Sequence, residues 1–327
     1  MTKKSIFHLI LFAVGLALCY VVMNFGLIKT SRVLIIQYVG IYIIFVLGIN
    51  LVNGYLGIFS MAHAGIMAVG GYTASLASMY IFTSQWMYPL SLLTGGLASV
   101  VAGLIVAVPS FKVRGDYLAI ITLGFSMIVK SILQNLEVVG GPRGLRPIPK
   151  YTNLIWVYLC VVLAVVMINR FVKSKYGRNM MAIREDQIAS ELVSVDVRRT
   201  KQVAFSVSAF FIGISGALIC HLLSYTNPNS YGFSTITDGL VMVYLGGVGS
   251  ITGSVIGATL WQILVQSLRS IGTWRWIIGG CILVVIMVFL PNGIFGNREL
   301  SLAGIKRTLA AIKNRFAKGA AGKKDVQ

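Results

Sequence analysis

Long apolar runs alternate with short polar stretches along the 327 residues of the chain. The runs lie near 6–28, 33–52, 61–83, 88–108, 117–136, 152–171, 202–225, 236–268 and 276–291. Most are close to the roughly 20 residues that a helix rising about 1.5 Å per residue needs to cross about 30 Å of hydrocarbon. The pattern therefore predicts an all-α polytopic membrane protein, with about 8–10 transmembrane helices once the longest run is divided.

Glycine-rich sequence interrupts this pattern at two places. The 236–268 run is too long for one ordinary span, and its middle reads GGVGSITG at 246–253, while NGYLG at 53–57 separates the second and third runs. Successive glycines weaken a helix, and broken helices at membrane depth are tolerated where they are buried in protein or line a cavity. We therefore expect broken or re-entrant segments near 53–65 and 244–258, and these two segments are the candidate translocation path.

The composition and the position of the charges support a membrane location. Apolar residues make up 57% of the chain and charged residues 11%, and the net charge is +19. The basic residues flank apolar runs, so we expect membrane topology charges and no nucleic acid partner. If the N-terminus is cytoplasmic and 236–268 crosses and returns, twenty of the 28 Lys and Arg lie inside and seven outside, which agrees with the positive-inside rule.

This orientation places both termini in the cytoplasm. Residues 6–28 are too long for the apolar part of a signal peptide and lack a cleavage site, so we interpret them as an uncleaved first span. We expect a transmembrane domain at 1–296, with a polar cytoplasmic loop at 172–201, and a basic cytoplasmic tail at 297–327.

The 172–201 loop predicts a short amphipathic helix. Asp186 is a good N-cap, and the turn that follows it places four apolar side chains on one face, namely Ile188, Ala189, Leu192 and Val193. Asp196 can cap the next helix, which continues into the membrane from Val197. An exposed helix of this kind can lie on lipid head groups, pack on its own bundle, or dock into a groove of a partner protein.

Several chemistries have no motif in this sequence. There is no phosphate-binding loop, no H-E-x-x-H and no nucleophile elbow, so we expect no catalytic residue, no metal site and no bound cofactor. Ion-coupled carriers usually need intramembrane carboxylates, and we find none near the middle of an apolar run. Lys130, Gln134 and Glu137 follow helical spacing and can snorkel to the outer face. Energy for transport must come from another subunit, or the chain is a passive pore.

The chain resembles the branched-chain amino-acid permeases of ABC importers, and among them the M-type subunit. The resemblance is carried, in family order, by NGYLGIFSMAHAGIMAVGGYTASL at 53–76, RGDYLAIITLGF at 114–125, VGGPRGL at 139–145, GRNMMAIREDQIASELVSVDVRRTKQVAFSVSAFFIGISGAL at 177–218, YLGGVGSITGSVIGA at 244–258 and PNGIFG at 291–296. These stretches cover most of 50–296.

The resemblance implies a heteromeric importer in a bacterial or archaeal plasma membrane. Its partners would be an H-type permease, two ATPases that use the ATP, and an extracytoplasmic substrate-binding protein. The cytoplasmic loop would then be the segment that couples ATP hydrolysis to the membrane helices, through Glu185, Asp186, Ile188, Ala189, Glu191, Leu192 and Val193. The translocation path would include Asn53, Gly54, Gly57, Ser60, Gly247, Gly249, Thr252 and Gly253, with Asn53, Ser60 and Thr252 passing along the charged ends of an amino acid.

Two positions depart from the family pattern. Ser194 stands where relatives commonly carry Gly, which puts the turn after the coupling helix in doubt. Asp238 stands where a small polar residue is expected, and we interpret it as an N-cap of the helix that follows.

Other functions remain to be compared with the importer subunit. A self-contained channel or facilitator for a small polar solute, such as urea or an amide, predicts transport by this chain alone and tolerance of changes in 184–196. A membrane-embedded enzyme would need a cluster of catalytic polar groups at one depth, which the sequence does not supply.

Overall fold

The structure, a computed structural model, describes residues 15, 29–110, 116–268, 280 and 293. Within these residues the chain folds into eight helices of 14 to 27 residues: α2 (Thr30–Asn50), α3 (His63–Tyr80), α4 (Tyr88–Ser110), α5 (Asp116–Asn135), α6 (Leu154–Val172), α9 (Val197–Leu223), α10 (Phe233–Gly246) and α11 (Ile251–Ser267). Two shorter helices, α7 (Lys175–Glu185) and α8 (Gln187–Leu192), lie between α6 and α9. The predicted all-α fold is confirmed.

These helices agree closely with the apolar runs of the sequence. Five of them, in the described part of the chain, are long and apolar enough to cross a membrane, and they include α2, α4, α5, α6 and α9. The 236–268 run divides into two helices, as predicted, because α10 ends at Gly246 and α11 begins at Ile251. The runs at 6–28 and 276–291 and the tail at 297–327 lie outside the described residues, so the total of 8–10 spans stays a prediction.

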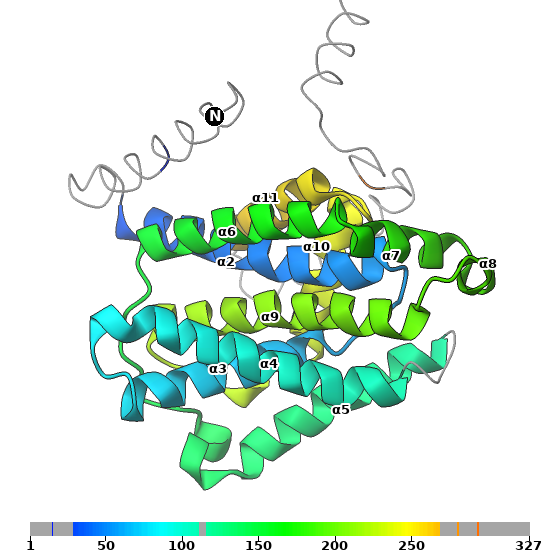
Figure 1. The fold of residues 1–327 in the computed structure, drawn as a ribbon. Coiled ribbons are helices and arrows are strands. Elements are labelled where there is room, and N and C mark those ends of the chain that lie inside the picture. Colours follow the sequence, from blue (N-terminus) through cyan, green and yellow to red (C-terminus); the bar gives the residue numbers. More distant parts are fainter. Residues whose placement is uncertain (1–14, 16–28, 111–115, 269–279, 281–292, 294–327) are drawn as a thin grey trace, which may run out of the picture.

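Helix α9 forms the centre of the bundle. It packs against α3 and α4 on one side and α2 on the other, while α6 covers α2 (Figure 1). Small residues bring the helices together: an added Cβ on Gly213 of α9 would meet Ser99 of α4, and one on Gly70 of α3 would meet the main chain of Gly213. In lipid, where no hydrophobic force drives helices together, such close backbone contact is a main source of association.

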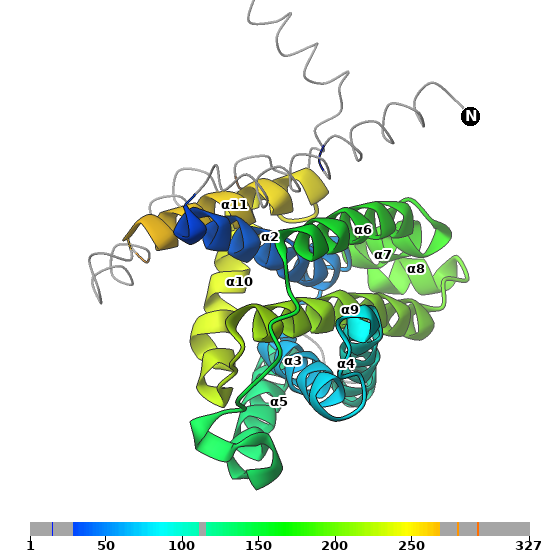
Figure 2. The same cartoon turned by 90° about the vertical axis from the view of Figure 1, so that its left-hand side faces the viewer.

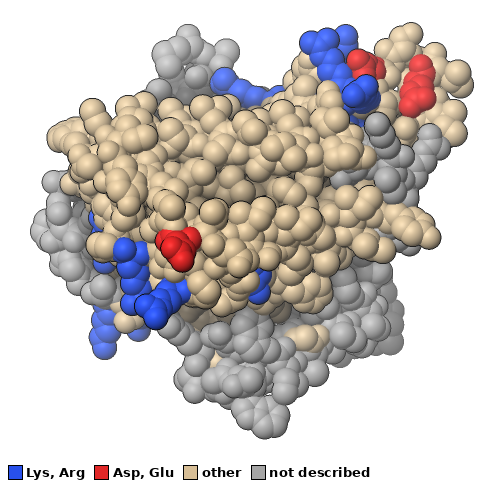
Figure 3. All heavy atoms as spheres, turned by 90° about the horizontal axis from the view of Figure 1, so that it is seen from below, with Lys and Arg blue, Asp and Glu red and all other residues tan. Residues whose placement is uncertain are grey.

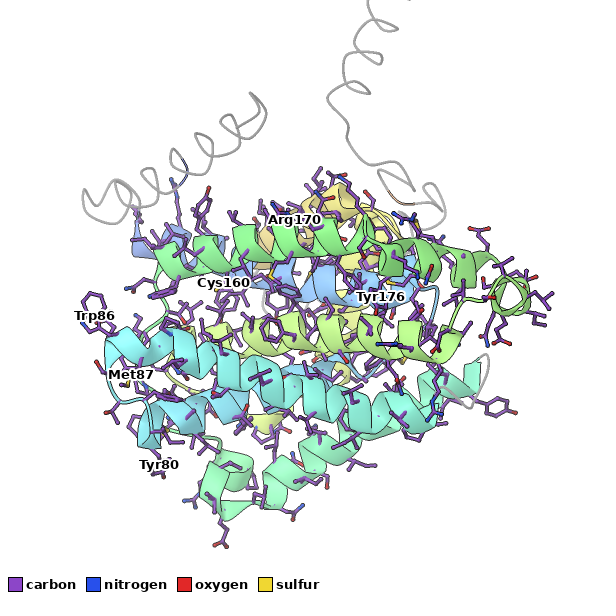
Figure 4. The ribbon with its side chains drawn as sticks, in the orientation of Figure 1. Tyr80, Trp86, Met87, Cys160, Arg170 and Tyr176 are labelled. Carbon is purple, nitrogen blue, oxygen red and sulfur yellow. The ribbon has the colours of Figure 1, made fainter. Side chains whose placement is uncertain are left out.

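The bundle has two distinct ends. We call the end that carries α7 and α8 the proximal end, and the opposite end, where α3 connects to α4, the distal end (Figure 1). Figure 3 shows Lys, Arg, Asp and Glu gathered mainly toward opposite ends of one face, with a broad uncharged expanse between them. Exposed Tyr80 and Trp86 lie at the distal end (Figure 4), and exposed Tyr117 begins α5 at the other end. Such aromatic belts are typical of membrane–water interfaces.

Helix α10 departs from the direction of the other long helices. Figure 2 shows it running across the bundle, from the neighbourhood of α3 and α5 toward α11 and α2. Its 14 residues correspond to about 21 Å, less than a full crossing. Asp238 lies in its second turn, and the N-cap is Gly232. The interpretation of Asp238 as an N-cap was wrong, because the helix begins at Phe233, five residues before Asp238.

Buried polar groups lock the distal half of the bundle. The two ring nitrogens of His221 bond to Ala217 O and to Ser78 Oγ, each at 2.8 Å. The Tyr88 hydroxyl bonds to Thr152 Oγ1 at 2.7 Å, and Thr152 Oγ1 donates to Leu218 O at 3.0 Å. These bonds join α3, α4, α9 and the chain before α6. Among the described residues no group of His, Cys, Asp and Glu could hold a metal ion.

Candidate functional site: the junction of the two broken segments

The first broken segment begins with a π-helical turn at Leu51–Tyr55, directly after α2. Irregular chain follows to His63, and it includes Gly57 with φ of +73°. The sequence predicted an interruption at 53–57, and the structure confirms its place while adding the π-turn. Such turns interrupt α-helices frequently at functional sites. Side-chain hydroxyls of α5 hold the segment, since Met61 N donates to Thr122 Oγ1 at 2.9 Å and Ser126 Oγ donates to Met61 O at 2.9 Å.

The second broken segment is the tight loop between α10 and α11. Gly247 and Gly249 have φ of +120° and +82°, values that favour glycine, and Ser250 caps α11 by accepting a hydrogen bond from Gly253 N at 3.0 Å. Gly253 and Thr252 belong to the first turn of α11, so the break is shorter than predicted. Gly253 instead lets α11 approach α10, because an added Cβ would meet Gly246 O.

The side chain of Asn50 ties the end of α2, where the first broken segment begins, to the second broken segment. Asn50, at the end of α2 and 1% exposed, donates from Nδ2 to Ser250 O at 3.0 Å and to Ser254 Oγ at 2.6 Å. Its Oδ1 accepts from Gly249 N at 2.9 Å. The amide thus gives the half-buried Gly249 N–H its partner and adds a hydrogen bond to Ser250 O, which also accepts from Ser254 N.

The two predicted segments approach each other at Gly54 and Gly249, and we call this place the junction: residues 50–60 together with 247–254. Gly54 packs so closely that an added Cβ would meet Asn50 Oδ1 and, at 2.6 Å, Gly249 N. Asn53 pairs through both amide atoms with the main chain of Ser60, at 3.3 Å each. In this conformation Asn53 braces the first segment, and a role for Asn53, Ser60 or Thr252 toward a solute stays a prediction.

Helix α7 contacts the junction through Arg184. Its Nη1 donates to Gly54 O at 2.8 Å, and its Cγ would lie 2.7 Å from a Cβ added to Gly57. The sequence interpretation missed both Arg184 and Asn50. A lone Asn ending an apolar run was the available signal for Asn50, whereas nothing local to 184 indicates a partner 130 positions away.

Helix α8 projects from the proximal end of the molecule (Figure 1). The predicted N-cap is confirmed, since Asp186 Oδ1 accepts from Ile188 N at 2.8 Å and from Ala189 N at 3.1 Å. Asp196 caps α9 through Arg199 N at 2.8 Å, also as predicted. The predicted apolar face is fully exposed: Ile188, Leu192 and Val193 are 62%, 82% and 72% accessible. Ala189, Glu185, Asp186 and Glu191 are exposed beside it.

The turn after α8 explains the position of Ser194. Its φ is +65°, and the bonds from Ser194 N to Glu191 O and from Val195 N to Ser190 O, both 3.1 Å, form a Schellman motif. The motif normally takes Gly at this position, because a Cβ is strained in the left-handed region. The departure noted in the sequence therefore leaves the turn intact, at a cost in strain. Lys201 Nζ bonds Gln187 Oε1 at 2.8 Å and ties α8 to α9.

Comparison with known proteins gives the family. Residues 31–291 match the family described as branched-chain amino acid transport system / permease component. The chain is 32% identical to the "high-affinity branched-chain amino acid transport system permease protein LivM" of Escherichia coli (strain K12), over 85% of this chain and 71% of the relative. It is 24% identical to LivH of the same organism over 44% and 47%.

A more distant match extends beyond amino-acid permeases. The "xylose transport system permease protein XylH" of Haemophilus influenzae is 26% identical over 42% of this chain and 39% of the relative. No solved structure matches. The extent and identity of the first matches show that the chain belongs to the branched-chain amino acid transport permease family, and within it to the LivM type.

Proposed function

We propose that this chain is the M-type permease subunit of an ABC importer that carries branched-chain amino acids into the cell. The permease role follows from the family, and the amino acids are those named for the LivM relatives. The observation that carries the proposal is the connection between α8 and the junction: an exposed apolar helix at one end, linked through α7 and Arg184 to both broken segments.

The partners in this proposal are an H-type permease, two ATPases and an extracytoplasmic binding protein. LivH-type relatives support a permease pair. The exposed face of α8 is suited to a groove on an ATPase, because an apolar patch of this kind on a short helix is a common docking element. ATP is used by the ATPases, and this chain supplies the membrane path.

The charges support an orientation with the proximal end in the cytoplasm of a bacterial or archaeal plasma membrane. In the described residues eight Lys and Arg lie between 170 and 201, at the proximal end, while Lys29, Arg32, Arg143, Arg146 and Lys150 lie in distal segments. Short cytoplasmic loops carry the excess of basic residues. Both termini would then be cytoplasmic.

In this mechanism closure of the ATPases pushes α8. Because α8 and α7 adjoin, the push reaches Arg184 and therefore the main chain at Gly54, and it also reaches the start of α9 at Val197. Asn50 carries the displacement on to the α10–α11 loop. The glycines there take up the change in φ and ψ at little steric cost.

Uptake of labelled leucine into vesicles tests the function. The vesicles would contain this chain together with the permease, ATPases and binding protein encoded beside it. We expect uptake that stops when ATP is depleted. Uptake that persists without ATP, or with this chain alone, would instead identify a facilitator.

A further inference from the structure

A cavity of about 190 Å³ opens in the distal half of the bundle, between α2, α3, α9 and α10. Its walls combine aromatic hydroxyls with hydrocarbon: Tyr38 and Tyr42 of α2, Met67 of α3, Ile219 and Leu223 of α9, and the polar segment 225–235. Pockets for drug-sized ligands have volumes of about 300–1,000 Å³, so this smaller cavity suits a smaller molecule.

Polar groups gather on one side of this cavity. Asp238 lies one turn beyond Thr235 on α10, and its charge acts on the wall residue Tyr42. It is the one carboxylate that the described residues place inside a bundle helix and away from its ends. A carboxylate at such a place is costly and marks a functional site by default.

The lining also contains buried hydroxyls. Tyr231 bonds Thr226 Oγ1 at 3.0 Å and Cys220 Sγ at 3.1 Å, and its ring lies edge-on to Tyr72 at 6.3 Å. The Tyr72 hydroxyl is buried close to the side chain of Thr226, which lines the cavity.

The rim of the cavity is basic and aromatic. The Arg146 guanidinium lies 4.0 Å from the ring centre of Tyr225, which lines the cavity. A hydrogen bond from Asn227 Nδ2, at 2.9 Å, lowers the pKa of the Tyr225 hydroxyl below its ordinary value. A cation beside the lining residue Tyr225 and a carboxylate beside the lining residue Tyr42 are complementary to a molecule that carries both charges.

From this geometry we infer that the distal cavity is a transit site for a small zwitterion with a hydrocarbon side chain. The Tyr42 hydroxyl, with the charge of Asp238 beside it, receives its ammonium group, and Tyr225, with Arg146 on its ring, faces its carboxylate. Met67, Ile219 and Leu223 hold its side chain. A larger groove of about 660 Å³ between α4, α6 and α9 offers only apolar side chains and Cys160, so it does not compete for such a ligand. The inference rests on the proposed function and adds the place at which the solute waits.

Beneath the cavity the bundle is closed. Gly239, next to Asp238, lies against Phe45 and Ile49 of α2, where an added Cβ would approach Ile49 Cδ1 at 2.5 Å and Phe45 Cε1 at 2.8 Å. Asn50 follows Ile49 directly and begins the junction. The cavity and the junction therefore lie on opposite sides of one contact between α2 and α10, and opening that contact would join them.

Protection of an introduced thiol tests the inference. Thr235→Cys places the thiol in the cavity wall, and Thr237→Cys, on the same helix, is the matched control because Thr237 is exposed. Both native hydroxyls bond only to nearby main-chain oxygens, Ser230 O and Phe233 O. The four native cysteines are first replaced by serine, and modification by a small methanethiosulfonate is timed in membranes with and without L-leucine.

We expect leucine to slow modification of Thr235→Cys about tenfold, which corresponds to a free energy of about 1.4 kcal/mol. The modification rate of Thr237→Cys should not change. 4-Methylpentanoate, which has the same hydrocarbon but no ammonium group, should not protect, and Asp238→Asn should abolish protection by leucine. Equal protection at both thiols, protection by 4-methylpentanoate, or none by leucine would overturn the inference.

The outcome separates this inference from the proposed function. Protection needs no ATP, so intact protection together with ATP-independent uptake would refute only the importer. ATP-driven uptake without protection would refute only the cavity.

Discussion

The Arg184 guanidinium donates a hydrogen bond of 2.8 Å to the main-chain carbonyl of Gly54, 130 positions earlier in the chain. Because the acceptor is a main-chain oxygen, this hydrogen bond depends on where the first broken segment lies and not on a side chain of that segment. It is the direct polar bond between helix α7 and the π-turn, and it gives the first prediction.

Replacing Arg184 by Ala should uncouple ATP hydrolysis from transport. A hydrogen bond to a charged donor contributes about 1.5–3 kcal/mol, so we expect solute moved per ATP to fall tenfold or more while hydrolysis continues. The measurement is the ratio of leucine uptake to phosphate release in vesicles. Arg184→Lys should restore part of the ratio.

Arg178→Ala is the matched control for Arg184. Arg178 belongs to the same helix and also donates to a main-chain oxygen, but it is exposed and its acceptor is the nearby Lys173 O, at 3.2 Å. We expect no change in the ratio. Parallel loss of uptake and hydrolysis in Arg184→Ala would contradict a coupling role and indicate a structural one.

Removing the Asn50 amide should destabilise the fold. Asn50→Ala leaves the half-buried Gly249 N–H without its partner, which costs about 1–3 kcal/mol, and removes the hydrogen bonds to Ser250 O and Ser254 Oγ. The expected result is a lower melting temperature of the purified protein in detergent. Asn135→Ala removes an exposed amide that bonds only Ser131 O, and it should melt like the parent. Equal melting temperatures of the two variants would show that the hydrogen bonds of Asn50 do not stabilise the fold.

Ser194→Gly should stabilise the turn after α8. A left-handed residue with a Cβ is strained by roughly 1–2 kcal/mol, and Gly removes this strain. Hydrogen exchange at Ser190–Val195 should slow in Ser194→Gly but not in Ser194→Ala, which keeps the Cβ. Faster exchange in the Gly variant would show that the flexibility of Gly in the unfolded chain outweighs the strain.

Acidic substitutions on α8 should abolish docking of the ATPase and spare the fold. Leu192→Asp and Val193→Asp place charge on side chains that are 82% and 72% exposed, so this chain loses no packing of its own. Co-purification of the ATPase measures the effect. Val138→Asp is the control, because Val138 is 73% exposed but belongs to the distal end. Normal recovery of the ATPase with Val193→Asp would refute the docking surface.

Much of the fold could be predicted from hydropathy and capping. Apolar runs gave the helix positions within a few residues, and Asp186 and Asp196 act as the caps that their sequence context indicated. The glycine-rich middle of 236–268 predicted two helices in this run, and the structure has α10 and α11 there. These features depend on neighbours in the chain, which is why local patterns predict them.

The rest depends on contacts between distant residues. Asn50 and Arg184 bind groups about 200 and 130 positions away, and no local pattern specifies such partners. The direction of α10 across the bundle is set by packing against α2 and α11, so periodicity indicated a helix but not its tilt, and Asp238 was placed too close to a helix start. A bulky side chain at Gly253 would disturb the packing of α11 against α10, because an added Cβ would meet Gly246 O.

The hydrogen bonds between Asn50 and the α10–α11 loop have a thermodynamic consequence. Helix α10 contributes Thr235 to the cavity wall and ends at the loop that Asn50 binds. Through Asn50 and α2 it is connected to Gly54, and through Gly54 to Arg184 and α7. Two binding sites that bias one shared set of helices must influence each other equally, whichever is filled first. If a docked ATPase changes the affinity of the cavity for its solute by some factor, a bound solute therefore changes the affinity of α8 for that ATPase by the same factor. A solute bound in the cavity would therefore change how tightly the resting transporter holds its ATPase.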